Sequence, residues 1–384
     1  MFILVYLKKL LQGSKLDRYL RLIVSYLSPF YYRYSKKPIF NDDSKFIYIC
    51  YGGLGDCILA FPFLKRISQN YKLTIFIENK FKDVDVLLSD NIEIIFYVKK
   101  NILKELKKYR KINKNYILIQ QSPILEFILF HIFLKRPPTI GFVYKQNQIA
   151  FEGFPIEKKE IKTDNKYLKY SILEKTIINI ASKNMSKQIN PIYTSKYQNL
   201  KFTYVLDFRY FILSPTKDAN WSMGFLDYKI YTNFIQKMIE NTQLKPVIVG
   251  TREDKKIIDN ILINLPSRLK PLNLAGKTGI IDLIGLIKQS DFVVANDNGV
   301  HHLSNFLNKK TLTLYNFSSY KVYNWPNKDS NYIFKPLYNC MPCVGKENGP
   351  FDNYPFKCPW NVRCKNTIDE EDIFKKLGEL KWIS

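Results

Sequence analysis

Short apolar runs alternate with helical patterns in two series along this 384-residue chain, one between Asp43 and Phe142 and one from Tyr210 onward. Strands that alternate with helices favour a parallel sheet with helices on both faces. The sequence therefore predicts two doubly wound α/β domains in tandem, with binding turns that face each other across a cleft. A polar, Lys-rich and Asn-rich stretch over 153–202 is typical of a connection between them. The predicted strands are Phe46–Cys50, Leu73–Ile77, Glu93–Val98, Tyr116–Gln120, Thr139–Phe142, Tyr210–Ser214, Pro246–Gly250, Leu272–Leu274, Asp291–Ala295 and Thr311–Tyr315, and the first helices are expected to start near Gly55, Lys80, Ile102 and Pro123.

One predicted strand ends in a polar turn that passes directly into a helix. The apolar run from Val293 is followed by Asp297, Asn298 and Gly299, and then by His302 within a helical pattern. Free N–H groups and the macrodipole at a helix N-terminus favour an anion, and glycine lets the backbone approach it closely. Asp297 is then a candidate for binding sugar or ribose hydroxyls, and His302 for facing a phosphate. The alternative is an ordinary turn in which Asp or Asn caps the helix.

The first strand of the chain also ends in a glycine-rich turn. Gly52, Gly53 and Gly55 allow a tight passage from strand to helix, but their spacing departs from the dinucleotide-binding fingerprint, so the turn gives NAD binding little support. Asp56 lies at the mouth of this turn. It is a candidate general base at the carboxyl edge of the sheet, and the alternative is a carboxylate that caps the helix.

The net charge of +25 suits an anionic partner such as a membrane or a phosphorylated glycolipid, and the chain lacks the motifs of nucleic-acid-binding proteins, so we expect no nucleic-acid partner. Residues 1–40 interleave eight basic residues and one acid with apolar residues in runs too short to span a bilayer. We expect either a basic amphipathic helix on the inner membrane surface or a helix packed on the protein body. The apolar run Ile124–Leu134 predicts a buried or interfacial helix, with His131 as a core or interface residue.

Four of the six cysteines lie close together near the end of the chain. A Cys-x-x-Cys pair with two further cysteines is typical of a metal knuckle that holds zinc or iron. A disulfide pair and free thiols are the alternatives, although nothing marks the chain as secreted. The predicted metal ligands are Cys340, Cys343, Cys358 and Cys364.

Together these segments resemble glycosyltransferase family 9, the lipopolysaccharide heptosyltransferase family, which has the GT-B fold. The resemblance extends from about Phe46 to Asp372. It is carried by Ser214–Lys217 through Trp221, Pro246–Gly250, Leu274–Thr278, Asp291–Leu303, Asn316–Ser319, Trp325–Pro326 and the opening turn at Asp56 with Pro62.

The resemblance implies an inverting transfer from a nucleotide sugar, usually ADP-heptose. The family's proposed base corresponds to Asp56, and its diphosphate motif to Asp297, Asn298, Gly299 and His302. Asn298 replaces the usual Thr, and its amide can still donate hydrogen bonds to a diphosphate. The family's phosphate-binding lysine has Lys217 as its nearest counterpart, and its acidic residue for the donor ribose has Glu253. A helix N-terminus and a lysine can stabilise the leaving diphosphate, so we expect no catalytic metal. Some members, including those that heptosylate autotransporter proteins, have a similar cysteine-rich segment, so a metal there would be structural, or would support assembly or acceptor docking, and would not be catalytic.

Two classes of function follow from the sequence. The first is a glycosyltransferase, cytoplasmic and peripheral on the inner membrane, that acts on a lipopolysaccharide, glycan or protein acceptor, with an oligomeric state left open. The second is a non-catalytic binding or assembly protein with the same fold. The presence of Asp56, Gly299 and His302 together favours the enzyme. The expected parts are a basic extension over 1–40, an acceptor domain with linker over 41–200, a donor domain over 201–335, and a Cys-rich segment with a helix over 336–384.

Overall fold

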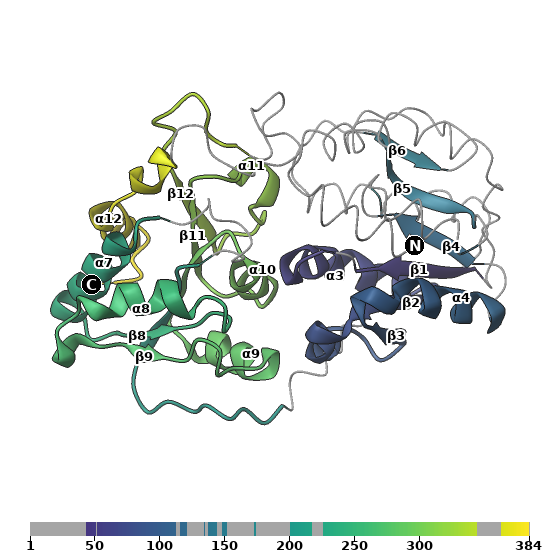
Figure 1. Ribbon diagram of the computed structural model, residues 1–384, viewed down its shortest axis with the longest axis horizontal. Coiled ribbons are helices and arrows are strands. Elements are labelled where there is room, and N and C mark those ends of the chain that lie inside the picture. Colours follow the sequence, from purple (N-terminus) through teal and green to yellow (C-terminus); the bar gives the residue numbers. More distant parts are fainter. Residues whose placement is uncertain are drawn as a thin grey trace. The chain divides into compact units, whose positions relative to one another are not determined.

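The structure is a computed structural model that describes residues 44–50, 52–112, 116–120, 134, 137–143, 148–151, 173, 200–216, 226–343 and 362–383 (Figure 1). The predictions for residues 1–40, the helix near Pro123, His131, Lys217 and Cys358 lie outside these residues. The chain divides into two compact units, Met1–Gly52 with Ala60–Asn199, and Gly53–Leu59 with Leu200–Ser384. Each helix within the described residues is too short or too polar to cross a membrane.

The sheet of the first unit has the strand order β3-β2-β1-β4-β5-β6. The five predicted strands are parallel, and the additional edge strand β6 is antiparallel to β5. Apolar residues of β1, β4 and α4, among them Ile47, Leu106 and Leu118, form one core of this unit. The elements are β1 (Lys45–Ile49), α3 (Leu54–Ser68), β2 (Lys72–Glu78), a 3-10 helix (Asn79–Leu87), β3 (Ile92–Tyr97), a 3-10 turn (Lys99–Asn101), α4 (Ile102–Ile112), β4 (Tyr116–Gln120), β5 (Thr139–Val143) and β6 (Gln148–Phe151).

The sheet of the second unit is parallel throughout, with the order β12-β11-β10-β7-β8-β9. Counted from its own first strand, it has the order 3-2-1-4-5-6 of the Rossmann fold, as does the first sheet. Its elements are β7 (Tyr210–Ser214), α7 (Tyr228–Asn241), β8 (Lys245–Ile248), α8 (Lys255–Ile263), a 3-10 turn (Ser267–Leu269), β9 (Leu272–Asn273), α9 (Ile280–Gln289), β10 (Val293–Asn296), α10 (Gly299–Phe306), β11 (Thr311–Tyr315), α11 (Tyr320–Tyr323), β12 (Ser330–Phe334), a 3-10 turn (Arg363–Asn366) and α12 (Glu370–Glu379).

Successive side chains along each strand of the second sheet point alternately to its two faces. Phe211, Phe292 and Leu312 belong to a core that also contains residues of α7, α8 and α12. On the opposite face, the Tyr210 hydroxyl donates to the Leu286 carbonyl of α9 at 2.9 Å. The helices α7 and α12 lie side by side (Figure 1). Since successive side chains of a strand point to opposite faces, helices on both faces follow directly from the apolar strand sequences.

The predicted strands all exist, and none of their ends moves by more than two residues. The strands β4, β7 and β11 match their predicted bounds residue for residue. Two edge strands, β6 and β12, were not predicted, and the helix expected near Lys80 is a 3-10 helix.

Candidate functional site

The carboxyl ends of β7 and β10 are neighbours in the second sheet, because the two strands pair with Ala295 opposite Ser214. The strand order reverses between them, since the chain continues outward from β7 through β8 on one side and from β10 through β11 on the other. In open α/β sheets, ligands bind outside the carboxyl ends of strands at such a reversal. The turn Asp297–Gly299 therefore lies at the position in the second unit where this type of fold binds ligands.

Asn298 joins the two strand ends. Its side-chain oxygen accepts hydrogen bonds from the N–H groups of Val300 at 2.9 Å and His301 at 3.1 Å, which caps α10. Its amide nitrogen donates to the Ser214 hydroxyl at 2.9 Å and to the Thr216 carbonyl at 2.7 Å. The sequence suggested this amide as a hydrogen-bond donor for the diphosphate. In the structure, the amide is bonded within the protein instead. Asn298 caps α10, which is the alternative that the sequence analysis gave to a ligand-binding role for this turn.

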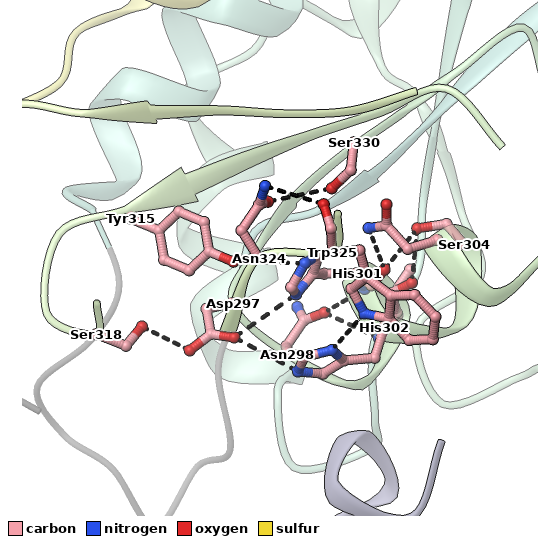
Figure 2. Close-up of polar contacts among 12 residues, drawn as sticks. Asp297, Asn298, His301, His302, Ser304, Tyr315, Ser318, Asn324, Trp325 and Ser330 are labelled. Atoms are coloured by element: carbon pink, nitrogen blue, oxygen red, sulfur yellow. Dashed lines mark hydrogen bonds and ion pairs between the residues drawn. The ribbon is translucent and has the colours of Figure 1, made fainter. Parts of the chain in front are cut away.

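Asp297 is buried at the start of the same turn. Its Oδ2 accepts a hydrogen bond of 2.5 Å from the hydroxyl of Ser318, in the turn after β11. Its Oδ1 lies 3.6 Å from Nδ1 of His301 and 3.6 Å from Nε2 of His302 (Figure 2). The ends of two neighbouring strands therefore fix this carboxylate beside two imidazole rings at the beginning of α10.

Both imidazoles have aromatic hydrogen-bonding partners. The indole N–H of Trp325 donates to Nδ1 of His302 at 3.0 Å, and the Tyr315 hydroxyl lies 3.5 Å from Nε2 of His301. Burial, and then the nearby charge of Asp297, raise the pKa of the Tyr315 hydroxyl well above its usual range, so Tyr315 is neutral. The two imidazole centroids are 4.3 Å apart. Asp297 is surrounded by hydrogen-bonding groups that are held in position from several elements.

Asp56 lies in the first turn of α3. Its carboxylate accepts a hydrogen bond of 3.3 Å from the N–H of Gly53, and its side chain is partly exposed. Gly52 has a φ of 147°, a backbone conformation that favours glycine, which explains one glycine of this turn. The capping role of Asp56 is present, and its role as a base stays a prediction.

The loop after β8 carries two acidic residues in different environments. Glu253, the candidate for the donor ribose, is exposed. Asp254 is buried, and its Oδ2 accepts hydrogen bonds from the N–H of Thr251 at 2.7 Å and from its hydroxyl at 2.8 Å. Asp254 therefore shapes the loop, whereas the exposure of Glu253 is compatible with binding a ligand.

The described cysteines form no disulfide. Cys343 and Cys364 are buried and Cys340 is partly buried. The N–H of Cys343 donates to the carbonyl of Phe317 at 2.8 Å, next to Ser318. Among the described residues, the close group of three metal-ligating side chains is Asp297 with His301 and His302, and it contains no cysteine. With Cys358 outside the description, the cysteine metal site stays a prediction.

Comparison with known proteins supports the same family. Residues 128–353 match the profile of glycosyltransferase family 9 (heptosyltransferase), whereas no curated protein matches the chain. Three solved structures from E. coli are similar to it. The ADP-heptose LPS heptosyltransferase II has a TM-score of 0.62 at 16% identity over 88% of this chain and 98% of its own. Heptosyltransferase WaaC with ADP has a TM-score of 0.60 at 13% identity over 87% of this chain and 99% of its own. The iron-containing dodecameric glycosyltransferase TibC has a TM-score of 0.53 at 10% identity over 89% of this chain and 77% of its own.

These structural likenesses confirm the GT-B fold with its Rossmann-like sheets. The profile match extends over more than half of the chain and ends beyond the turn of Asp297 and the segment of Trp325. This protein therefore belongs to glycosyltransferase family 9, the heptosyltransferase family, and is a glycosyltransferase.

Proposed function

We propose that the protein transfers heptose from ADP-heptose to a hydroxyl of a lipopolysaccharide, glycan or protein acceptor, with inversion at the anomeric carbon. The observation that carries the proposal is the turn Asp297–Gly299 at the start of α10, where a helix N-terminus lies at the strand-order reversal of the second sheet. Family membership supports the sugar, and the similar structures with ADP and ADP-D-β-D-heptose support the nucleotide.

In this proposal, the first turn of α10 binds the diphosphate. As the bond to the sugar breaks, negative charge accumulates on the leaving ADP. The positive end of the α10 dipole stabilises that charge, and Lys217 supplies a cation. Asp297 orients the imidazole N–H groups beside the phosphate, and Glu253 binds the ribose. This set of groups is sufficient to handle the leaving group without a catalytic metal.

Asp56 is the proposed general base. An acceptor hydroxyl must lose its proton as it attacks the anomeric carbon, and a positioned carboxylate accepts that proton. The hydrogen bond from Gly53 to Asp56 holds the carboxylate at the start of α3. The +25 charge and the basic residues 1–40 support an anionic acceptor and contact with an anionic inner membrane surface.

We also propose a structural zinc or iron held by Cys340, Cys343, Cys358 and Cys364. Four thiolates suit either ion, and the iron content of TibC supports iron. Two observations fit an ordered site: Cys343 and Cys364 are buried, and a backbone hydrogen bond fixes Cys343 to the strand-end turn at Phe317.

The test of the function is a donor screen with purified protein, read by mass spectrometry, followed by Asp56→Asn. We expect transfer from ADP-heptose and a fall in rate of about 10²–10⁴ in Asp56→Asn, with ADP affinity unchanged. The matched control is Asp282→Asn, because Asp282 accepts a hydrogen bond from the N–H of Gly279 at 3.4 Å in the same helix-start arrangement. Activity of Asp56→Asn within about tenfold of wild type would contradict the assignment of the base.

A further inference from the structure

The close group formed by Asp297, His301 and His302 has the composition of a metal site. A carboxylate and two imidazoles are the ligands of a common iron-binding triad, and the three ligand atoms lie within 4.8 Å of one another. All three side chains are buried. The question is whether each imidazole offers a lone pair or an N–H to the space beside Asp297.

For His302, the hydrogen bond from Trp325 answers this question. An indole nitrogen can only donate a hydrogen bond, so Nδ1 of His302 must accept it and carries no proton. In a neutral imidazole the proton is then on Nε2, the nitrogen that faces Oδ1 of Asp297 at 3.6 Å (Figure 2). A nitrogen that carries a proton has no lone pair for a metal. His302 is therefore a hydrogen-bond donor.

The surroundings hold Trp325 in the orientation that this bond requires. Trp325 is 5% exposed, and its ring packs edge-on against Phe306 of α10 at a centroid distance of 6.4 Å. Its backbone carbonyl accepts a hydrogen bond of 3.2 Å from the side chain of Asn324, which in turn accepts one of 3.1 Å from Ser330 at the start of β12. The indole is thus fixed from α10 and from the edge of the sheet.

We propose that Trp325 is a positioning residue that holds His302 as the neutral tautomer protonated on Nε2, so that His302 donates this N–H to the diphosphate bound at the start of α10. The donor role rests on the proposed function, whereas the tautomer does not. The charge on the phosphate oxygens grows as ADP leaves, and a hydrogen bond to a charged oxygen is stronger than one between neutral groups. A donor fixed beforehand requires no reorientation at that moment.

The tautomer is tested first, in the full wild-type chain without ligand. With three histidines and four tryptophans, protein labelled with ¹⁵N in these residues gives few ring signals. We expect a scalar coupling across the hydrogen bond between Nε1 of Trp325 and Nδ1 of His302, and a directly bonded proton on Nε2 of His302. His302→Ala and Trp325→Phe assign the signals. A proton on Nδ1, or no coupling in the wild type, would overturn the proposal whether or not ADP binds.

The action of Trp325 through His302 is tested by a double-mutant cycle on ADP binding by calorimetry. We expect Trp325→Phe to weaken ADP binding about 3- to 10-fold in the wild-type background and by less than about 2-fold in the His302→Ala background. Trp382→Phe removes an indole N–H elsewhere in the same unit and serves as the matched control. Equal losses in both backgrounds would assign Trp325 a merely structural role and refute the proposal.

The two failures can be told apart. If wild-type protein bound no ADP while the coupling was present, the proposed function and the donor role of His302 would fall together, and the tautomer would stand. If added Zn²⁺ or Mn²⁺ abolished the coupling and bound through His302, the group would be a metal site and the inference would be wrong.

Discussion

Asn298 holds together the two strand ends that build the donor site, so its removal has a cost that can be worked out from its contacts. In Asn298→Ala, α10 loses its cap, which costs about 0.5–2 kcal/mol. The Ser214 hydroxyl and the Thr216 carbonyl also lose the amide that donates to them at 2.9 Å and 2.7 Å. Leaving such groups without a partner costs about 1–3 kcal/mol. We expect the second unit to lose about 2–4 kcal/mol of its free energy of unfolding.

Asn298→Thr is the matched variant, because a threonine hydroxyl still caps a helix while the link to Ser214 and Thr216 is lost. We expect it to cost about 1–2 kcal/mol. Asn298→Asp keeps the cap as well, but it points a carboxylate at the carbonyl oxygens of Ser214 and Thr216. It should therefore destabilise the unit although a negative charge suits a helix N-terminus.

Urea unfolding followed by tryptophan fluorescence measures these differences. All four tryptophans lie in the part of the chain that belongs to the second unit, so the signal reports this unit even if the first unfolds separately. We expect the order wild type, Asn298→Thr, Asn298→Ala from most to least stable. Equal destabilisation by Thr and Ala, or both variants within about 0.5 kcal/mol of wild type, would refute the assigned roles of the cap and the amide.

Three further predictions use the candidate residues. Glu253→Gln should weaken ADP binding without changing the thermal midpoint, because Glu253 is exposed, and unchanged affinity in calorimetry would remove it from the ribose site. The double variant Cys340→Ser/Cys343→Ser should lose about one zinc or iron per chain and have a lower thermal midpoint, and elemental analysis that finds no metal in wild-type protein purified without chelator would reject the site. Deleting Met1–Pro38, which carries eight basic residues and one acid, should release the folded protein from anionic vesicles, and unchanged sedimentation with liposomes would rule out this anchor.

The strands of both sheets could be predicted because most are buried apolar runs between turn residues. Tyr210–Ser214 is buried along its whole length, with Arg209 before it and Pro215 after it. The strands β6 and β12 lie at sheet edges and were not predicted, although the other two edge strands, β3 and β9, were. In β12, Ser330, Asn331 and Tyr332 are partly or well exposed, so the sequence shows no continuous apolar run there.

For the site, the sequence identified the turn but not the partners that come to it from other elements. Asp297 and Asn298 were visible because they follow an apolar run directly. Ser318 lies three residues after the end of the neighbouring strand β11, so a search of that strand end would have found it. The contact of Trp325 with His302 depends on the path of the chain between β11 and β12, and periodicity gives no information about such a contact. From the sequence, the amide of Asn298 was expected to donate hydrogen bonds to a ligand. Its hydrogen bond to Ser214 could not be foreseen, because it forms only when β7 and β10 are adjacent in the folded sheet.

The packing of α12 has a consequence for the synthesis of this protein. Ile373 and Leu377 are fully buried in the core that Phe211 and Phe292 share, and Lys335 and Lys237 form ion pairs with Asp372 and Glu371 of this helix. Domains generally fold as units during translation. Here α12, a helix that is synthesised after the Asp297 turn, completes the core of the unit that carries this turn. A chain released before Asp369 would therefore leave part of that apolar face exposed to aggregation, however complete its sequence around Asp297.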